Sequence, residues 1–352
     1  MGIKHSIKKK IMLAALKRKN REQPFDLVKY ENHTLANDAT RFDINSYYFS
    51  AHNLGGESLL FRQALRGEGF HEMWFVYHTK DGTYANKISS YTNGNPSGLS
   101  LSLVEAGREW KFKFRGKLVK MRIDETRLAS FSDQEVDVEA EGTFRANSAM
   151  FDFAYHLDRE LLADALAKEK WNRRFKNDSK LNQQTHIEQQ GVIEATIKID
   201  GRDHSFKANA MRDHSFGRRD WDYMDRHIWL MALIREGEAL NLNRVSYPHM
   251  SQLVTGYYEK DNRVQQISKK TNMARIPNNG FVPDKFSYHV ELQNGLIFDV
   301  KAEVEVIIPF VFNEGKYVLF EGIGSFDINK RKARGIIEFG FNEDETRWNK
   351  GE

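Results

Sequence analysis

The chain contains no cysteine among its 352 residues. Disulfide bonds, thiolate nucleophiles and cysteine-based zinc or iron–sulfur sites are therefore excluded, because each needs a cysteine sulfur. Proline is also scarce, with 6 residues, and short alternating segments are frequent, which favours β structure. No apolar run approaches the length of about 18 residues that a membrane-spanning helix needs, so we expect none.

The chain also lacks a large excess of either charge, since it has 53 basic and 49 acidic residues. A nucleic-acid-binding protein usually carries a strong basic excess, so we expect no such partner. The motifs Gly-x-x-x-x-Gly-Lys-Ser/Thr, Gly-x-Gly-x-x-Gly and Gly-x-Ser-x-Gly are missing, and we expect no cofactor. We also expect no metal, because no pair of these histidines has the spacing of a zinc helix: His52, His71, His78, His227, His249 and His289.

What the chain does contain is a long series of short strand patterns separated by turn signals. Residues 110–115 alternate apolar and basic side chains, and residues 228–234 form a fully apolar run that indicates a buried strand. Strands with one dry and one wet face are typical of antiparallel sheets. Their spacing of roughly 8–12 residues favours a sandwich or a barrel.

The strand pattern is interrupted once, at residues 157–175, where apolar residues recur at helical spacing. We expect this helix to connect two β units and to pack on the first of them. The resulting organisation has a basic helical leader at 1–39, a first barrel with the connecting helix at 40–184, and a second barrel at 185–352.

The leader carries eight basic residues and no acidic residue between Lys4 and Arg21. A solvated, frayed segment is one interpretation, and a basic helix that touches an anionic membrane surface is the other. The start, with Gly2 and Ser6, also fits the short myristoylation pattern. We expect a cytoplasmic protein, with peripheral membrane contact through this segment as the alternative.

The pentapeptide Arg-Asp-His-Ser-Phe occurs twice, at residues 202–206 and 212–216. The first copy follows an alternating stretch and the turn signal Asp200-Gly201, so it is typical of an ordinary hairpin strand. The second copy continues as Gly-Arg-Arg-Asp-Trp to residue 221. Three arginines, two aspartates, a histidine and a tryptophan in ten residues indicate either a buried polar network or a site.

Asp213 and His214 are the candidate catalytic residues, because both can exchange a proton near neutral pH. Neighbouring residues of a regular strand point to opposite faces, so both would face one cavity only if Gly217 introduced a bulge. The alternative is a structural network in which arginines pair with aspartates. Trp221, Tyr223 and Trp229 would share one face if the segment is extended, and they would either line an apolar pocket or pack in a core.

Several stretches resemble one family, which is found beside or within phosphoenolpyruvate synthase-like proteins of animals. They are residues 166–171, 184–189, 212–221 and 322–327. The phosphotransfer part of those proteins is missing here, so their activity is not expected. More distantly, Asp213, His214 and Gly217 resemble the Asp-His-x-x-Gly core of carotenoid 1,2-hydratases and fungal Diels–Alderases. That resemblance implies an all-β fold of two consecutive lipocalin-like antiparallel barrels and an apolar pocket.

Two functions follow from this resemblance. In the first, a lyase or isomerase binds a hydrophobic small molecule of the isoprenoid or polyene class and catalyses acid-initiated hydration, isomerisation or cyclisation. Asp213 would be the general acid, with its pKa raised by burial, and His214 would orient it or act as base. Trp221, Tyr223, Trp229, Arg212 and Arg218 would contact the substrate. In the second, the protein is a non-catalytic carrier or interaction module.

Overall fold

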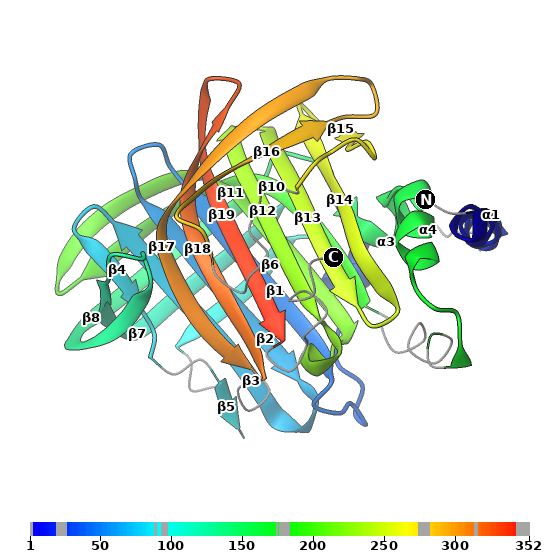
Figure 1. The fold of residues 1–352 in the computed structure, drawn as a ribbon. Helices are drawn as coiled ribbons and strands as arrows, with labels where there is room; N and C mark the ends of the chain where they lie inside the picture. The colour runs from blue at the N-terminus through cyan, green and yellow to red at the C-terminus, as the bar shows by residue number, and fades with distance from the viewer. Residues whose placement is uncertain are drawn as a thin grey trace.

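The computed structural model describes residues 3–18, 27–87, 90–92, 98–173, 175, 184–273, 282–312 and 316–342. Two large sheets lie against each other, and helices occupy one side (Figure 1). All pairs of named strands within this part of the chain are antiparallel. The expected all-β fold with two antiparallel units is confirmed.

The first sheet is a closed barrel. Its path runs β11-β1-β2-β3-β4-β7-β8-β10, and β10 pairs with β11 to close the ring. The short strands β5, β6 and β9 attach at its edges. The bounds are β1 Asp43–His52, β2 Ser58–Arg66, β3 Phe70–Thr79, β4 Gly82–Ala85, β5 Ser90–Thr92, β6 Leu99–Glu105, β7 Glu109–Ile123, β8 Ala129–Ala146, β9 Phe151–Asp152, β10 Gln184–Ile199 and β11 Arg202–Arg218.

The second sheet has the strand order β15-β14-β13-β12-β19-β18-β17-β16. Isolated bridges between Ile267 and Leu292 and between Asn272 and His289 bring the chain after β15 against the β16 edge. The bounds are β12 Arg226–Arg235, β13 Glu238–Tyr247, β14 Met250–Lys260, β15 Arg263–Gln266, β16 Lys285–Glu291, β17 Ile297–Phe312, β18 Tyr317–Ile328 and β19 Arg331–Asn342.

The boundary between the two sheets lies later than expected. Residue 184, where we placed the end of the first barrel, is the first residue of β10, and both β10 and β11 belong to the first sheet. The chain crosses to the second sheet after Arg218, through the short 3₁₀ turn η2 (Trp221–Tyr223), and enters β12 at Arg226. The motif at residues 212–221 is therefore the end of the first barrel and the start of the crossing.

Four helices are described: α1 Ile3–Arg18, α2 Leu27–Glu31, α3 Phe153–His156 and α4 Arg159–Lys168, with a further 3₁₀ turn, η1 Gly67–Gly69. Of these helices, α1 and α4 lie beside the second sheet, whereas α2 and α3 contact the first. The helix expected at 157–175 corresponds to α4, which Asp158 caps by accepting from the backbone N–H groups of Glu160 and Leu161. Within the described residues, no helix has the length and apolarity needed to cross a membrane.

The expected packing of α4 on the first β unit is wrong. Its Ala165 and Leu166 pack with Met250 and Leu253 of β14, in the second sheet. The helix carries its apolar side chains on one stripe, and β14 is the edge-side strand that offers a matching apolar surface. The opposite side of α4 contacts α1 through ion pairs, among them Lys9 Nζ to Glu160 Oε2 at 3.0 Å.

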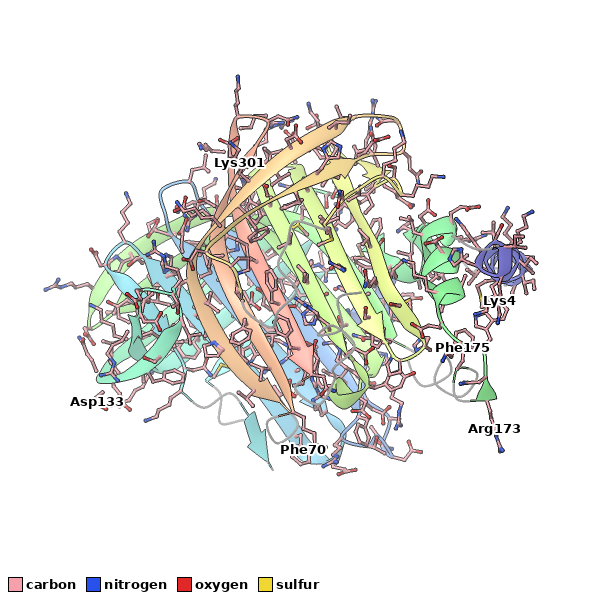
Figure 2. All side chains as sticks on the ribbon, in the orientation of Figure 1. Lys4, Phe70, Asp133, Arg173, Phe175 and Lys301 are labelled. Carbon is pink, nitrogen blue, oxygen red and sulfur yellow. The ribbon has the colours of Figure 1, made fainter. Side chains whose placement is uncertain are left out.

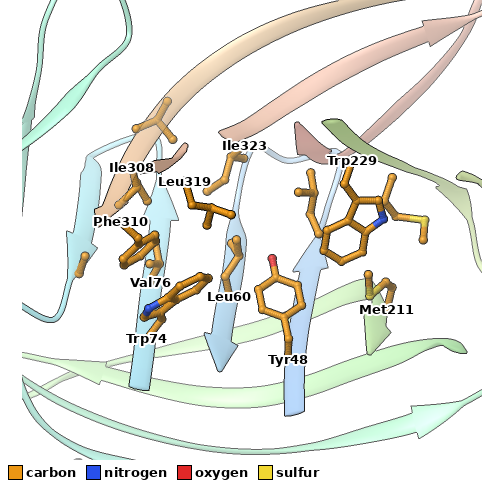
Figure 3. Close-up of a cluster of buried hydrophobic side chains, with 14 of the residues drawn as sticks. Tyr48, Leu60, Trp74, Val76, Met211, Trp229, Ile308, Phe310, Leu319 and Ile323 are labelled. Carbon is orange, nitrogen blue, oxygen red and sulfur yellow. The ribbon is translucent and has the colours of Figure 1, made fainter. Parts of the chain in front are cut away.

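Successive side chains of each strand point to opposite faces, so the buried apolar residues of the two sheets form three cores. In β12, Ile228 and Leu230 face the interior of the second sheet, whereas Trp229 and Met231 face the first barrel. The third core fills the inside of the first barrel, around Phe49. Figure 3 shows the core between the sheets, where Trp74 of β3 stacks on Phe310 of β17 with ring centroids 3.9 Å apart.

Candidate active site

The two pentapeptides have different surroundings although their residues are identical. The first copy lies beyond the Asp200-Gly201 turn, where both residues have positive φ, and its polar side chains are exposed while Phe206 is buried. It is the hairpin strand that the sequence predicts. The second copy lies farther along β11, between β1 and β10 and beneath the second sheet, so both of its faces are buried.

Asp213 and His214 point to opposite faces of β11. Gly217 has a φ of 109°, yet the pairing with β1 runs without a register shift through both residues. The His214 ring stacks on Tyr47 at 4.1 Å, and its Nε2 hydrogen-bonds to Asn45 Oδ1 at 2.9 Å. Burial, together with the charge of Arg212, lowers its pKa to about 3. His214 is thus a neutral ring on the barrel-interior face of β11.

Arg212 shares that interior face. Its Nε donates to Gln189 Oε1 at 2.9 Å, and its Nη1 donates to Glu31 Oε2 at 3.2 Å. The Arg212 and Glu31 side chains are each 2% exposed, so α2 closes this end of the barrel through a buried ion pair. Arg218, by contrast, is exposed and lies over the Phe42 ring at 5.0 Å. We expected Arg212 and Arg218 to contact a substrate, but they lie in the barrel interior and on the exposed surface, respectively.

The space between the two sheets contains a cavity of about 250 Å³. One wall is a cross-strand row of the first barrel, in which each residue is the register partner of the next: Asp213, Tyr48, Arg62 and Trp74. The facing wall is a similar row of the second sheet: Thr255, Asn243, Trp229 and Glu338. Side chains of register partners share one face of a sheet, so two rows facing each other enclose a defined site.

Two of the three predicted aromatic residues line this cavity. Trp221 and Trp229 do, from η2 and β12. Tyr223 does not line it, because residues 221–223 form a 3₁₀ turn instead of the extended segment that the prediction required. The Tyr223 hydroxyl hydrogen-bonds to His249 Nδ1 at 2.9 Å. A recess of about 40 Å³, lined in part by Tyr223 and Arg218, adjoins the cavity through shared wall residues.

Asp213 belongs to a first proton-holding cluster. Its Oδ1 accepts from Ser215 Oγ at 2.8 Å, and its Oδ2 pairs with His186 Nε2. His186 Nε2 also lies 3.5 Å from Glu188 Oε1, and Glu188 Oε2 accepts from Tyr257 Oη at 2.6 Å and from Asn241 Nδ2 at 2.9 Å. The three groups therefore contact one another, although Glu188 Oε1 has no hydrogen-bond partner among the described residues.

The expected rise in the Asp213 pKa is wrong in sign. Burial raises the pKa of this carboxyl, but the adjacent His186, Arg219 and Ser215 outweigh it, and the pKa falls below its usual value. Conversely, burial lowers the pKa of His186, but Asp213 and Glu188 outweigh it and raise the pKa. The proton of this pair therefore resides on His186. Burial also raises the pKa of Glu188 to about 7.

A second cluster lies on the facing sheet, and sequence reasoning missed it. Glu338 and Glu321 are register partners on β19 and β18. Glu338 Oε1 is 2.5 Å from His227 Nε2, and Glu321 Oε1 accepts from Tyr48 Oη at 2.8 Å. Burial, with the neighbouring carboxyl, raises the pKa of Glu321, and burial raises that of Glu338 to about 7. Two adjacent buried carboxyls cannot both ionise readily, so the pair retains a proton near neutral pH.

The His186, Glu188 and Asp213 donor atoms lie within 4.8 Å of one another, so these three residues could hold a metal ion. Nitrogen and carboxylate donors suit several divalent cations. One oxygen of each carboxylate is already taken by a protein donor, however. The expectation of no metal stays a prediction.

The alternation of His186 and Glu188 with their neighbours is a weak sequence signal, and it can be interpreted only once the structure is known. These two residues alternate with Ile187 and Gln189, which face the barrel interior, so both point from β10 toward the cavity. In the sequence, residues 184–189 are distinguished only by their resemblance to a known family. Nothing local shows that Glu188 is the register partner of Asp213.

Comparison with known proteins gives a family and a fold. The chain belongs to the family described as Domain of unknown function (DUF7064), whose model matches residues 48–343. No curated protein is significantly similar to it in sequence. The crystal structure of a protein described as an AttH, from Nitrosomonas europaea, is similar with a TM-score of 0.51 and 10% identity, over 88% of this chain and 97% of that chain.

A crystal structure of kievitone hydratase from Nectria haematococca is similar with a TM-score of 0.47 and 9% identity, over 87% of this chain and 90% of that chain. At such low identity, the likeness to the AttH structure supports the lipocalin-like two-unit fold alone. The resemblance to phosphoenolpyruvate synthase-like proteins finds no counterpart among these comparisons.

Proposed function

We propose that the protein binds a small, largely apolar molecule between its two sheets and transfers protons to and from it, as a hydratase or an isomerase does. The observation that carries the proposal is a pair of acids with opposed proton affinities in one cavity. Asp213 stays ionised on one wall, and Glu338 holds a proton to about pH 7 on the other. Groups whose surroundings separate their pKa values in this way are suited to act as acid and base.

The cavity volume limits the substrate. A dry cavity of about 150 Å³ accepts benzene, so by that scale about 250 Å³ accommodates about ten non-hydrogen atoms. A single isoprenoid unit, a monoterpene or a small aromatic group fits this size, whereas a long polyene would have to extend beyond the cavity. The apolar walls, with Trp74, Trp221 and Trp229, favour such a body.

The residues divide into donors and acceptors of a proton. Protonated Glu338 would give its proton to one carbon of a double bond, while a water oxygen bonds to the other carbon. Ionised Asp213, held beside protonated His186, would take the proton that this water releases, so that the net change is addition of one water molecule. Without water, removal of a substrate proton by the same base gives an isomer instead. Trp229 lies 5.8 Å from Tyr48 and 6.5 Å from His186 by ring centroids, where its face can stabilise developing positive charge.

A carrier is the competing function, and it would be favoured if Asp213 and His214 were both paired and buried away from the cavity. His214 is buried away from the cavity, and its Nε2 is paired with Asn45, which is typical of a structural role. Asp213 faces the cavity but is also paired, with Ser215 and His186. The second cluster favours the enzyme, because Glu338 and Glu321 place a retained proton in the same space at the cost of burying two carboxyls.

Solvent exchange tests the proposal without a known substrate. Geraniol, geranic acid and cyclic enones would be incubated with the protein in deuterium oxide, and deuterium uptake followed by mass spectrometry. The wild type should exchange carbon-bound hydrogen or add labelled water to at least one probe. Asp213→Asn and Glu338→Gln should each lower that rate by about 10²–10⁴-fold, the usual contribution of one acid or base.

The controls separate chemistry from folding. Both variants should bind the reactive probe with nearly unchanged affinity and retain the wild-type circular dichroism spectrum. Asp327→Asn, an exposed β18 carboxylate paired with Lys332, should exchange at the wild-type rate. Binding of these probes by the wild type with no exchange in any of them would establish the carrier.

A further inference from the structure

Two arginines of the cavity wall have buried guanidinium nitrogens that no protein atom in the described part satisfies. Arg62 lies over Trp74 at 4.8 Å and donates from Nη1 to Glu72 Oε2 at 2.6 Å, but its Nη2 has no partner there. Arg219 lies over Trp221 at 4.9 Å, and its buried Nε likewise has none. A buried donor without an acceptor is destabilising, and more so when it is charged, so a ligand acceptor would be favoured at both positions.

The surrounding charges leave this part of the cavity positive. Glu72 pairs with both Arg62 and Arg66, at 2.6 Å each, and thus balances only one of them. Although burial raises the pKa of Glu72, the two arginines outweigh it and lower the pKa to about 2, so this carboxylate is fully ionised. Burial, together with the positive charges of Arg62 and Arg66, lowers the pKa of Arg219. Asp213, whose charge partly offsets that of Arg219, is already paired with His186.

We propose that the ligand of this cavity carries a carboxylate or a similarly compact oxyanion on its apolar body, held by Arg62 Nη2 and Arg219 Nε. The inference rests on the proposed function, which makes the cavity the ligand site. A guanidinium group matches the plane and oxygen spacing of a carboxylate. The two tryptophans beneath the arginines hold the planes of both guanidinium groups in place. The substrate class is therefore a small unsaturated acid rather than a neutral hydrocarbon.

Matched probes test this assignment. Octanoate and octanol differ in the head group alone, and geranate and geraniol repeat the comparison on an isoprenoid body. Because Trp74, Trp221 and Trp229 line the cavity, binding should change tryptophan fluorescence. Wild-type protein should bind each acid at least about tenfold more tightly than its alcohol, as expected for a charge-assisted hydrogen bond. Equal affinities for acid and alcohol in both pairs would overturn the proposal.

Substitution of single arginines tests which residue causes the preference for acids over alcohols. Arg219→Gln should reduce the acid-to-alcohol ratio to about one while alcohol binding stays within about twofold, because only the charged contact is lost. Arg115→Gln, at an exposed β7 arginine paired with Glu139, should keep the wild-type ratio. Retention of the full ratio in Arg219→Gln would also overturn the proposal. Should that variant lose alcohol binding altogether, Arg62→Gln replaces it, and an unchanged ratio in that variant overturns the assignment.

These assays measure binding and need no turnover, so the two proposals can fail separately. If deuterium exchange persists in Asp213→Asn and Glu338→Gln, the acid–base function is lost while the preference for acids stands. If the wild type exchanges deuterium but binds acids and alcohols equally, only the oxyanion site is lost.

Discussion

At the scale of single residues, neighbours in the sequence have unrelated roles. Asp213 faces the cavity with Ser215, while Arg212 and His214 face the barrel interior, because β11 keeps its alternation without a bulge. The run 212–221 therefore contains both of the alternatives that the sequence left open. One face is a structural network, and the other faces the cavity of the proposed site. Asp213 takes part in the site as an ionised partner of His186 instead of as a protonated acid.

Arg212 should matter for stability and not for ligand contact. Arg212→Met removes one partner of a buried ion pair and leaves Glu31 without its cation, which usually costs about 3–5 kcal/mol. Urea denaturation should show a lower unfolding free energy of that order. The double variant Arg212→Met with Glu31→Gln should recover part of it, because no unpaired charge is left. A single variant as stable as the wild type would contradict the role.

Glu259 should make the protein less stable as pH rises. Burial raises its pKa in the folded state to about 7 from an ordinary value of 4.5, so the folded state binds its proton more tightly than the unfolded state does. Stability from this group is then complete below pH 4.5 and falls until about pH 7. Glu259→Gln, which cannot ionise, should match the wild type at pH 4.5 and exceed it by up to about 3 kcal/mol at pH 8.

The measurement for Glu259 is a series of urea denaturation curves across that pH range. Glu139→Gln, at an exposed carboxylate of β8, serves as the control and should follow the wild-type curve at every pH. If Glu259→Gln showed the same pH dependence as the wild type, the buried carboxyl would not be responsible.

At the scale of elements, local sequence patterns correctly predicted the strands and the turn that depend on local interactions. The alternation at 110–115 became β7, the apolar run at 228–234 became β12, and the Asp200-Gly201 turn joins β10 to β11. The helix predicted at 157–175 corresponds to α4, but the prediction is too long because apolar spacing does not mark the helix end at Lys168. The extended segment expected at 221–223 became a 3₁₀ turn, since the chain must cross there from one sheet to the other.

The candidate site was harder to predict because it depends on register between distant strands. Asp213 meets Tyr48 of β1 and Glu188 of β10, and Trp229 of β12 meets Glu338 of β19. No local pattern fixes these pairings, since shifting one strand by a residue would turn its side chains to the other face. The sequence could therefore select Asp213, Trp221 and Trp229, but not His186 or Glu338.

At the scale of the whole molecule, apolar side chains fill both the first barrel and the inner face of the second sheet, and the cavity lies between the two sheets. The proposed ligand site therefore lies where the outer faces of the two sheets meet. Each sheet then contributes one proton-holding cluster, so neither half of the chain has a complete site. Separate expression of either half should give no deuterium exchange.

The N-terminal helix determines how the whole molecule could meet a membrane. His5 and Lys9 face α4, where they lie 3.6 Å and 3.8 Å from Asp164, so α1 is docked instead of frayed. Its outer face exposes Ile3, Ile7 and Ile11, and the intervening lysines Lys4, Lys10 and Lys17 are exposed too. Figure 2 shows Lys4 at the edge of the molecule, beyond α4. Apolar and basic side chains on one outward face suit an anionic lipid surface.

Sedimentation with anionic vesicles tests this contact. Each lysine near such a surface contributes about 1 kcal/mol, so Lys4→Gln with Lys10→Gln and Lys17→Gln should weaken binding by about a hundredfold or more. Lys9→Gln, at a lysine already paired with Glu160 and Asp164, should have little effect, and neutral vesicles should bind neither form. Removal of residues 1–21 should abolish binding altogether. Equal sedimentation of the full and shortened chains, or of neither, would exclude the helix as a membrane contact.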